Sequence, residues 1–258
     1  MKKLLLLAMT FVFMFSFTAC SGGFLSENDI LDVSVNPEAK IVLEYDLDDG
    51  EGVREVELVF ELFYNKAPST VANFIKLAND GYYNNKIIDY ANLNSNAGSM
   101  SYISGGRYYI DEEGDIVDDA KSYNIKGEFI ANQWDANDLK HQFGSLVMDR
   151  DLGAGEAFDT ASTRFYISLS ESVERNRNYC VFGQFKSSKY TLDGEQFVSA
   201  NSISSHFIND KLGLQTEQKA EKSGKLTLTQ VPKNAIVFKS ITIDSKGVDY
   251  SKAKVAKV

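Results

Sequence analysis

The sequence predicts a mainly β fold, a closed β-barrel capped by two α-helices. Several short segments alternate apolar and polar residues, the pattern of strands with one buried face. One segment instead carries apolar residues at helical spacing, and a second candidate helix follows late in the chain. Apolar residues make up 43% and charged residues 24% of the 258 residues, which is ordinary for a chain with a buried core. Closing the sheet into a barrel covers the apolar face and removes unpaired edges.

The first two strands are predicted to form a hairpin. Residues 39–45 have the composition of a strand, and Asp48-Asp49-Gly50-Glu51-Gly52 supplies turn residues. Residues 55–62 then alternate apolar side chains with mostly acidic ones. This alternation predicts a second strand with one face buried against the core.

A helix is predicted to follow this hairpin. It begins near Pro68, because proline suits the first turn of a helix, and it ends at Gly81. Its apolar residues recur at positions i, i+3, i+4 and i+7 and form one stripe: Val71, Phe74, Ile75 and Ala78. The second helix is predicted over residues 202–212.

The rest of the chain supplies further strands and loops. Residues 84–96 are rich in asparagine and show no clear period, and residues 214–230 are polar and predict an exposed excursion. The later strands are expected at residues 144–148, 163–169, 179–185 and 235–243.

The N-terminus has the features of a bacterial lipoprotein signal peptide. Lys2 and Lys3 precede the apolar run 4–17, which is shorter than the ~20 residues that a membrane-spanning helix needs. Thr18-Ala19-Cys20-Ser21 follows and resembles a lipobox. We therefore expect residues 1–19 to be removed and Cys20 to carry lipid. The chain would then be held in the cell envelope, facing outside the cytoplasm, with residues 20–37 as a polar tether. The alternative is ordinary cleavage nearby, with Cys20 lost or unmodified.

Composition argues against several classes of site. A net charge of −9 does not suit nucleic acid, because phosphate binding needs a basic surface. If Cys20 is lipidated, Cys180 has no disulfide partner, and its apolar neighbours predict a buried side chain. His141 and His206 do not cluster with cysteines, and the acidic loops lack the EF-hand spacing, so no metal site is expected. His141 is expected to be a hydrogen-bonded structural residue.

A series of segments resembles the cyclophilin-type peptidyl-prolyl isomerase family. Seven segments match the family in the family's order. They are Ala67-Pro68-Ser69-Thr70-Val71-Ala72-Asn73-Phe74, Gly81-Tyr82-Tyr83, Ile103-Ser104-Gly105-Gly106, Ile125-Lys126-Gly127-Glu128-Phe129, His141-Gln142-Phe143-Gly144-Ser145-Leu146-Val147-Met148, Thr163-Arg164-Phe165-Tyr166-Ile167 and Val181-Phe182-Gly183. The resemblance implies a cyclophilin-like domain over residues 38–246, with insertions near 91–100 and 186–230. Residues 247–258 would be a C-terminal tail.

This resemblance implies an eight-stranded antiparallel barrel with a helix closing each end. It also implies isomerisation of X-Pro bonds, whose uncatalysed barrier is about 20 kcal/mol. The expected partners are proline-containing segments of extracytoplasmic polypeptides, and the membrane through lipid on Cys20. No cofactor, metal or nucleic acid is expected, and the chain is expected to be a monomer.

The resemblance also locates a groove, and there the chain departs from the family. Cyclophilins use an arginine in a phenylalanine-histidine-arginine stretch, but here the stretch reads Ile87-Ile88-Asp89-Tyr90, with Tyr90 where the arginine is expected. Tyr90 carries no positive charge at neutral pH. The other groove positions implied by the resemblance are Ser104, Met148, Asp149, Phe165, Tyr166, Glu174 and Tyr179.

Three interpretations of this departure stay open. The activity is weakened or lost, which leaves an isomerase of low activity, a non-catalytic peptide-binding or chaperone module, or a surface protein with a blocked groove. Arg164 relocates the missing cation and acts as a catalytic residue across the same groove. Arg164 instead pairs with Glu174 or Asp149 and has a purely structural role.

Overall fold

The computed structural model describes residues 23–46, 48, 50, 52–92, 100–151, 157–192, 195–198, 216–220 and 227–258. The predicted signal peptide 1–19, Cys20 and the predicted second helix 202–212 lie outside these residues. Within them, no helix is long and apolar enough to cross a membrane.

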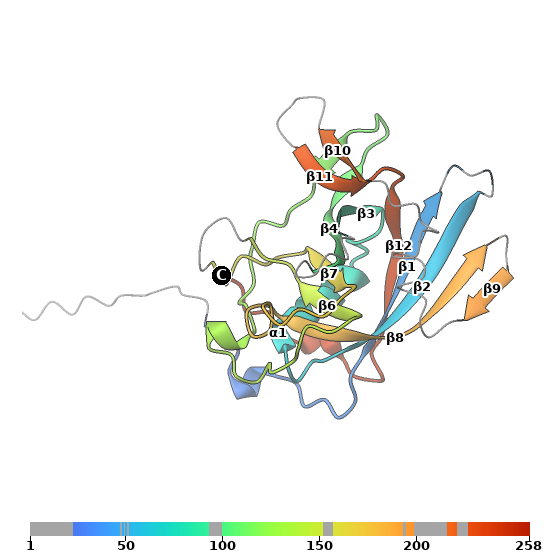
Figure 1. Cartoon of the computed structure of the whole chain (residues 1–258). Coiled ribbons are helices and arrows are strands. Elements are labelled where there is room, and N and C mark those ends of the chain that lie inside the picture. Colours follow the sequence, from blue (N-terminus) through green and yellow to red (C-terminus); the bar gives the residue numbers. More distant parts are fainter. Residues whose placement is uncertain are drawn as a thin grey trace, which may run out of the picture.

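Eight strands form a closed antiparallel barrel (Figure 1). Around the ring they are β2 (Val53–Leu62), β1 (Glu38–Asp46), β12 (Ile236–Asp244), β3 (Lys86–Asn92), β4 (Tyr102–Ile110), β7 (Phe165–Ser168), β6 (Ser145–Met148) and β8 (Val181–Leu192). Pairing of β8 with β2 closes the ring. The predicted closed barrel is therefore confirmed, and every pairing around it is antiparallel.

The predicted hairpin is the β1–β2 pair. Ile41 lies opposite Leu58 in its register, and both side chains are fully buried. The neighbouring positions on the other face, Lys40 and Glu57, are not buried and form an ion pair at 3.4 Å. The period of two therefore decides which face of the hairpin enters the barrel.

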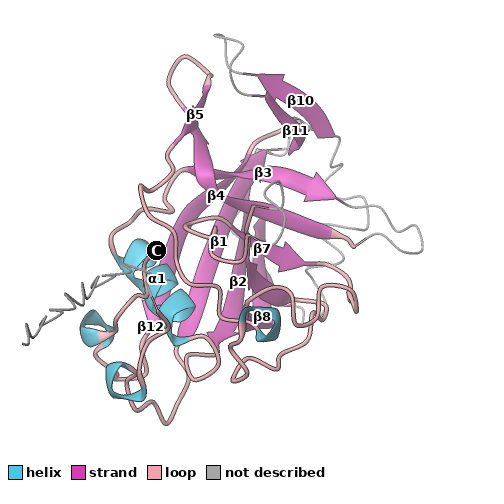
Figure 2. Ribbon diagram, turned by 90° about the vertical axis from the view of Figure 1, so that its left-hand side faces the viewer, coloured by secondary structure: helices cyan, strands magenta, loops and turns pink. Residues whose placement is uncertain are grey.

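Helix α1 (Pro68–Asn79) closes one end of the barrel, beside the C-terminus (Figure 2). Its predicted apolar stripe is buried, and Gly81 follows with a positive φ of 70°. At its N-terminus the backbone N–H groups of Ser69 and Thr70 donate to the two carboxylate oxygens of Glu128, at 2.9 and 2.8 Å. Glu128 is 1% exposed, and burial raises its pKa to about 7. It satisfies two backbone donors that a helix N-terminus leaves open. Among the described residues α1 is the one α-helix.

Strands β3 and β4 were not predicted from residue patterns. In β3 both faces are largely buried, because Ile87 packs on an outer apolar cluster with Tyr108 and Leu228. In β4 the backbone of β3 comes so close that position 105 must be glycine. A Cβ on Gly105 would lie 2.5 Å from the carbonyl oxygen of Ile87. The short strand β5 (Ile116–Asp118) pairs with β4, and β9 (Glu195–Val198) pairs with β8.

The predicted excursion at 214–230 contains a hairpin, β10 (Thr216–Ala220) with β11 (Thr227–Pro232). It lies on the side of the molecule away from α1 (Figures 1 and 2). Leu228 of β11 packs on the outer cluster of β3 and β4, so part of this segment covers the barrel rather than extending freely into solvent.

Both ends of the described chain pack against the barrel. The predicted tether, residues 20–37, contains the 3₁₀ turn η1 (Glu27–Asp29), and further along it the Leu31 N–H donates to the Tyr64 hydroxyl at 3.3 Å. The predicted tail contains η3 (Tyr250–Lys252), and the Ala256 N–H donates to the Ser69 hydroxyl at 2.8 Å. Part of the predicted tether therefore packs on the barrel: Val33 is 5% exposed, and Ile30 and Leu31 pack against the main core. A third turn, η2 (Ile130–Asn132), lies between β5 and β6.

Candidate functional site

Tyr90 lies on β3 at the outer face of the barrel. Its ring stacks on that of Tyr102 in β4, with centroids 5.2 Å apart and an interplanar angle of 27°. Burial raises the pKa of Tyr102 to about 12, so this tyrosine is neutral at physiological pH. The position that the family resemblance gives to an arginine therefore holds a neutral aromatic stack.

The residue before Tyr90 binds the one groove arginine that the sequence singled out. The side chain of Asp89 is fully buried, and its Oδ1 accepts from Arg164 Nε at 2.9 Å and Nη2 at 2.5 Å. Arg164 Nη1 donates to Asp149 Oδ2 at 2.7 Å. Burial raises the pKa of Asp89 to about 6, and the charge of Arg164 limits the rise. One guanidinium thus faces two carboxylates, and when all three groups are ionised they together carry a net charge of −1.

The structure therefore shows the structural pairing predicted for Arg164 with Asp149. Glu174, the other predicted partner, lies on an exposed loop. Asp149 is held further by the hydroxyl of Ser104, which donates to Oδ2 at 3.2 Å, and by the Arg150 N–H, which donates to Oδ1 at 3.0 Å. Ser104 is fully buried, so it supports the ion pairs from beneath rather than facing solvent.

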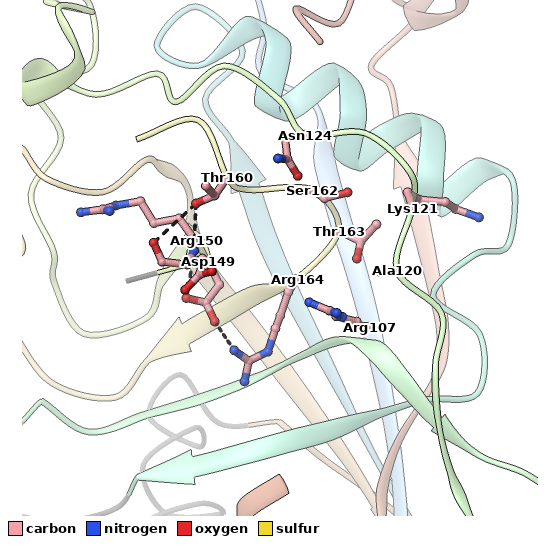
Figure 3. A pocket seen from close by; sticks show the side chains of 11 residues that line it. Arg107, Ala120, Lys121, Asn124, Asp149, Arg150, Thr160, Ser162, Thr163 and Arg164 are labelled. Carbon is pink, nitrogen blue, oxygen red and sulfur yellow. Dashed lines mark hydrogen bonds and ion pairs between the residues drawn. The ribbon is translucent and has the colours of Figure 1, made fainter. Parts of the chain in front are cut away.

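A polar pocket of about 470 Å³ opens beside these ion pairs (Figure 3). Asp149 and Arg164 meet at one edge, and Lys121 and Asn124 lie across the opening. Arg107 also lines it and makes a bidentate ion pair with Asp118, at 2.7 and 2.6 Å. The pocket is suited to polar backbone or side-chain groups of a ligand rather than to an apolar ring.

An aromatic cluster lies on the other side of Tyr102. Tyr166 of β7 is fully buried and shares a hydrogen bond of 2.6 Å with Nε2 of His141. Burial lowers the pKa of His141 to about 4, so the ring is neutral at physiological pH. The prediction of a hydrogen-bonded structural histidine is confirmed. Tyr179 is 8% exposed and packs edge-on against Tyr166, with centroids 6.2 Å apart.

Arg175 completes this cluster. Its guanidinium carbon lies 5.0 Å from the ring centroid of Tyr102, 5.5 Å from that of Tyr166 and 4.9 Å from that of Tyr179. A second guanidinium, that of Arg150, lies 4.8 Å from the Tyr179 centroid. Four of the six arginines of the chain thus lie in or beside the groove: Arg107, Arg150, Arg164 and Arg175.

The structure brings some of the predicted groove residues together and not others. Tyr90, Ser104, Asp149, Tyr166 and Tyr179 surround Arg164 and Arg175 as described above. Met148 lines a small pocket together with Arg150 and Phe129, and both Met148 and Phe165 belong to the main core inside the barrel. Alternation along β7 explains this, because Phe165 and Tyr166 point to opposite faces.

Two residues of the site were missed by sequence reasoning. Asp89 had a local signal, since a carboxylate among the apolar residues of a strand needs a partner when it is buried. Arg175 had none, because its contacts depend on three rings that are distant in sequence. Cys180 is 3% exposed, as predicted, and burial raises the pKa of its thiol well above the ordinary value. Among the described residues no three His, Cys, Asp or Glu side chains gather as metal ligands would.

Comparisons with known proteins point to one family. The family model described as cyclophilin type peptidyl-prolyl cis-trans isomerase/CLD matches residues 50–208. Peptidyl-prolyl cis-trans isomerase B of Escherichia coli (strain K12) is 29% identical over 196 residues, which is 72% of this chain and 93% of that protein. A peptidyl-prolyl cis-trans isomerase of Helicobacter pylori (strain J99) is 29% identical over 133 residues, 51% of this chain and 68% of that protein. The crystal structure of a cyclophilin type peptidyl-prolyl cis-trans isomerase of Cryptosporidium parvum shows 20% identity and a TM-score of 0.49, over 81% of this chain and 98% of that one.

Proposed function

Because the chain belongs to the cyclophilin-type peptidyl-prolyl cis-trans isomerase family, we propose that it is a prolyl isomerase of weak activity on extracytoplasmic polypeptides. Such an enzyme forms no covalent intermediate. It holds the proline ring on an apolar wall and stabilises the twisted amide, in which the lone pair is localised on the proline nitrogen. A fixed guanidinium near that nitrogen favours the twisted state over the planar one.

The pairing of Arg164 is the observation on which the weak activity rests. Tyr90 supplies no cation, and the guanidinium of Arg164 is bound by Asp89 and Asp149. Its donors are used within the protein, and the two carboxylates reduce the positive potential that a substrate nitrogen would experience. Arg164 remains the candidate for any residual catalysis, because its side chain is 31% exposed at the edge of the pocket.

A protease-coupled assay with X-Pro peptides tests this proposal. The expected result is turnover above the solvent background but far below that of a relative that keeps the arginine. Turnover equal to the background would contradict the enzymatic proposal. Turnover at the level of such a relative would contradict the weakness that the pairing of Arg164 implies.

The second candidate is a non-catalytic peptide-binding or chaperone module. The stack of Tyr90 on Tyr102 favours it, because an aromatic binding surface stands at the position that the family resemblance gives to the catalytic arginine. Binding of proline peptides without any turnover would support this candidate over the first.

We also propose that the protein is anchored in the cell envelope by lipid on Cys20, on the basis of the signal peptide and lipobox-like residues alone. Expression of the full chain in a bacterium that is fed radiolabelled fatty acids tests this proposal. Label on the wild type and none on Cys20→Ser is the expected result. Label that persists in Cys20→Ser would contradict the assignment.

A further inference from the structure

Arg175 lies in the loop between β7 and β8, directly over the aromatic cluster. Its guanidinium is within 5.5 Å of the ring centroids of Tyr102, Tyr166 and Tyr179. No carboxylate in the described part of the chain forms an ion pair with it. The faces of the rings, together with a side-chain hydrogen bond to the Tyr166 hydroxyl, therefore hold this guanidinium.

The ring that the family resemblance gives to the proline pocket is Tyr166, and it is fully buried. Its edges and faces are covered by Tyr102, His141, Tyr179 and Arg175. A proline ring gains its binding energy from contact with an apolar wall, and a wall with no accessible surface offers none. In this conformation the pocket is closed to such a ligand.

The backbone around Arg175 is fixed by hydrogen bonds on both sides. The Ser172 N–H donates to the carbonyl oxygen of His141 at 3.3 Å, and the His141 N–H donates to Asn176 Oδ1 at 2.7 Å. The Ala131 N–H donates to the carbonyl oxygen of Arg177 at 2.9 Å. Opening the pocket therefore requires rotation of the Arg175 side chain and leaves the loop in place.

We propose that Arg175 is a specificity-determining residue that closes the aromatic pocket and must be displaced before a proline-containing peptide binds. This inference rests on the proposed function, since it takes the pocket to be the proline site. Removing the guanidinium from the three rings costs free energy on binding. The measured affinity for a peptide is therefore lower than the intrinsic affinity of the open pocket.

Peptide titration of the chain from residue 21 onward tests the inference. The probe is a succinylated Ala-Ala-Pro-Phe anilide, and its Kd is measured by NMR shifts for the wild type, Arg175→Ala and Arg177→Ala. Arg177 is the matched control, because it is an exposed arginine of the same loop. We expect binding about tenfold tighter in Arg175→Ala and unchanged in Arg177→Ala. An unchanged or weaker affinity in Arg175→Ala would overturn the inference.

A second variant guards against a purely structural role. Arg175→Lys keeps the charge but lacks the planar group that covers the rings, and we expect it to bind about threefold tighter than the wild type. A structural role would lower the thermal midpoint of both variants without tightening peptide binding. Binding rather than turnover is measured, so the absence of isomerase activity would contradict the proposed function and leave this test intact.

Discussion

The two faces of β7 differ in how they tolerate change. On the inner face Phe165 packs against Phe74, Tyr83 and Phe238, with ring centroids 5.3 to 5.4 Å apart. On the outer face Tyr166 contacts a histidine and an arginine through polar and cation–π interactions. The inner contacts depend on shape and volume, which leave few alternatives. The outer contacts define the site chemistry, so the site can diverge while the barrel persists.

The largest effect should come from the inner face. Phe165→Ala removes a ring that is 1% exposed and leaves a cavity among three other rings, so we expect a loss of about 3–5 kcal/mol in the free energy of unfolding. Urea denaturation measures it. On the outer face of the barrel, Tyr90→Phe in β3 keeps the stack on Tyr102 and should stay within about 0.5 kcal/mol of the wild type. Equal losses in the two variants would remove the contrast between the faces.

The ion pairs around Arg164 should show the next largest effect. Arg164→Met leaves the buried carboxylate of Asp89 without its cation, and we expect a loss of about 3 kcal/mol at pH 7. The double variant Asp89→Asn with Arg164→Met should recover most of this loss, because the fully buried charge is gone and the carboxylate that remains, Asp149, is 16% exposed. The prediction is wrong if the double variant is as unstable as the single one.

The same variants separate the two roles of Arg164. If Arg164 supplies residual catalysis, then the Asp89→Asn and Arg164→Met double variant should fall to the solvent background in the coupled assay although it is stable. Turnover retained in that variant would leave the arginine with a structural role only.

A pH series should reveal the buried carboxylate under α1. The folded-state pKa of Glu128 is raised to about 7 from 4.5, so between these values the native state holds a proton that the unfolded state releases. The raised pKa of Glu128 therefore stabilises the folded state below pH 4.5. This part of the free energy of unfolding, on the order of 2–3 kcal/mol, is lost as the pH rises to 7. Compared with Glu128→Gln, the wild type should therefore lose more stability between pH 4.5 and 7. Parallel pH profiles for the two proteins would contradict the prediction.

Local patterns predicted the β1–β2 hairpin and α1, and also β6 and β7, whose two faces are both buried, but they missed β3 and β4. The β1–β2 hairpin has one face that is not buried, so its period of two is visible in the sequence. Helix α1 was predicted from its apolar stripe and Pro68, although ten of its twelve residues are buried, because covered polar residues such as Ser69, Thr70 and Asn73 keep the stripe visible. Strand β3 shows no period, because Leu228 and its neighbours cover the outer face around Ile87. The site residues also divide into those that the sequence identified and those that only the fold revealed. Tyr90 was found from its place in a family motif, whereas the pairing of Asp89 with Arg164 joins residues 75 positions apart and needed the fold.

The smallest energetic effect we expect is the most informative about function. Tyr90→Arg places a guanidinium on the outer face of β3 while Phe165 and the inner core stay unchanged. The new side chain still stacks on Tyr102, so stability should change little. A donor aimed at the proline nitrogen should raise turnover in the coupled assay by about tenfold. This is less than the effect of a preorganised donor, because the new guanidinium would follow directly after the carboxylate of Asp89 in the chain. Tyr90→Gln is the control, since it extends a donor without charge and should not raise turnover. If Tyr90→Arg folds normally and stays at the wild-type rate, then the missing cation is not what limits this groove, and the covering of Tyr166 by Arg175 becomes the stronger explanation.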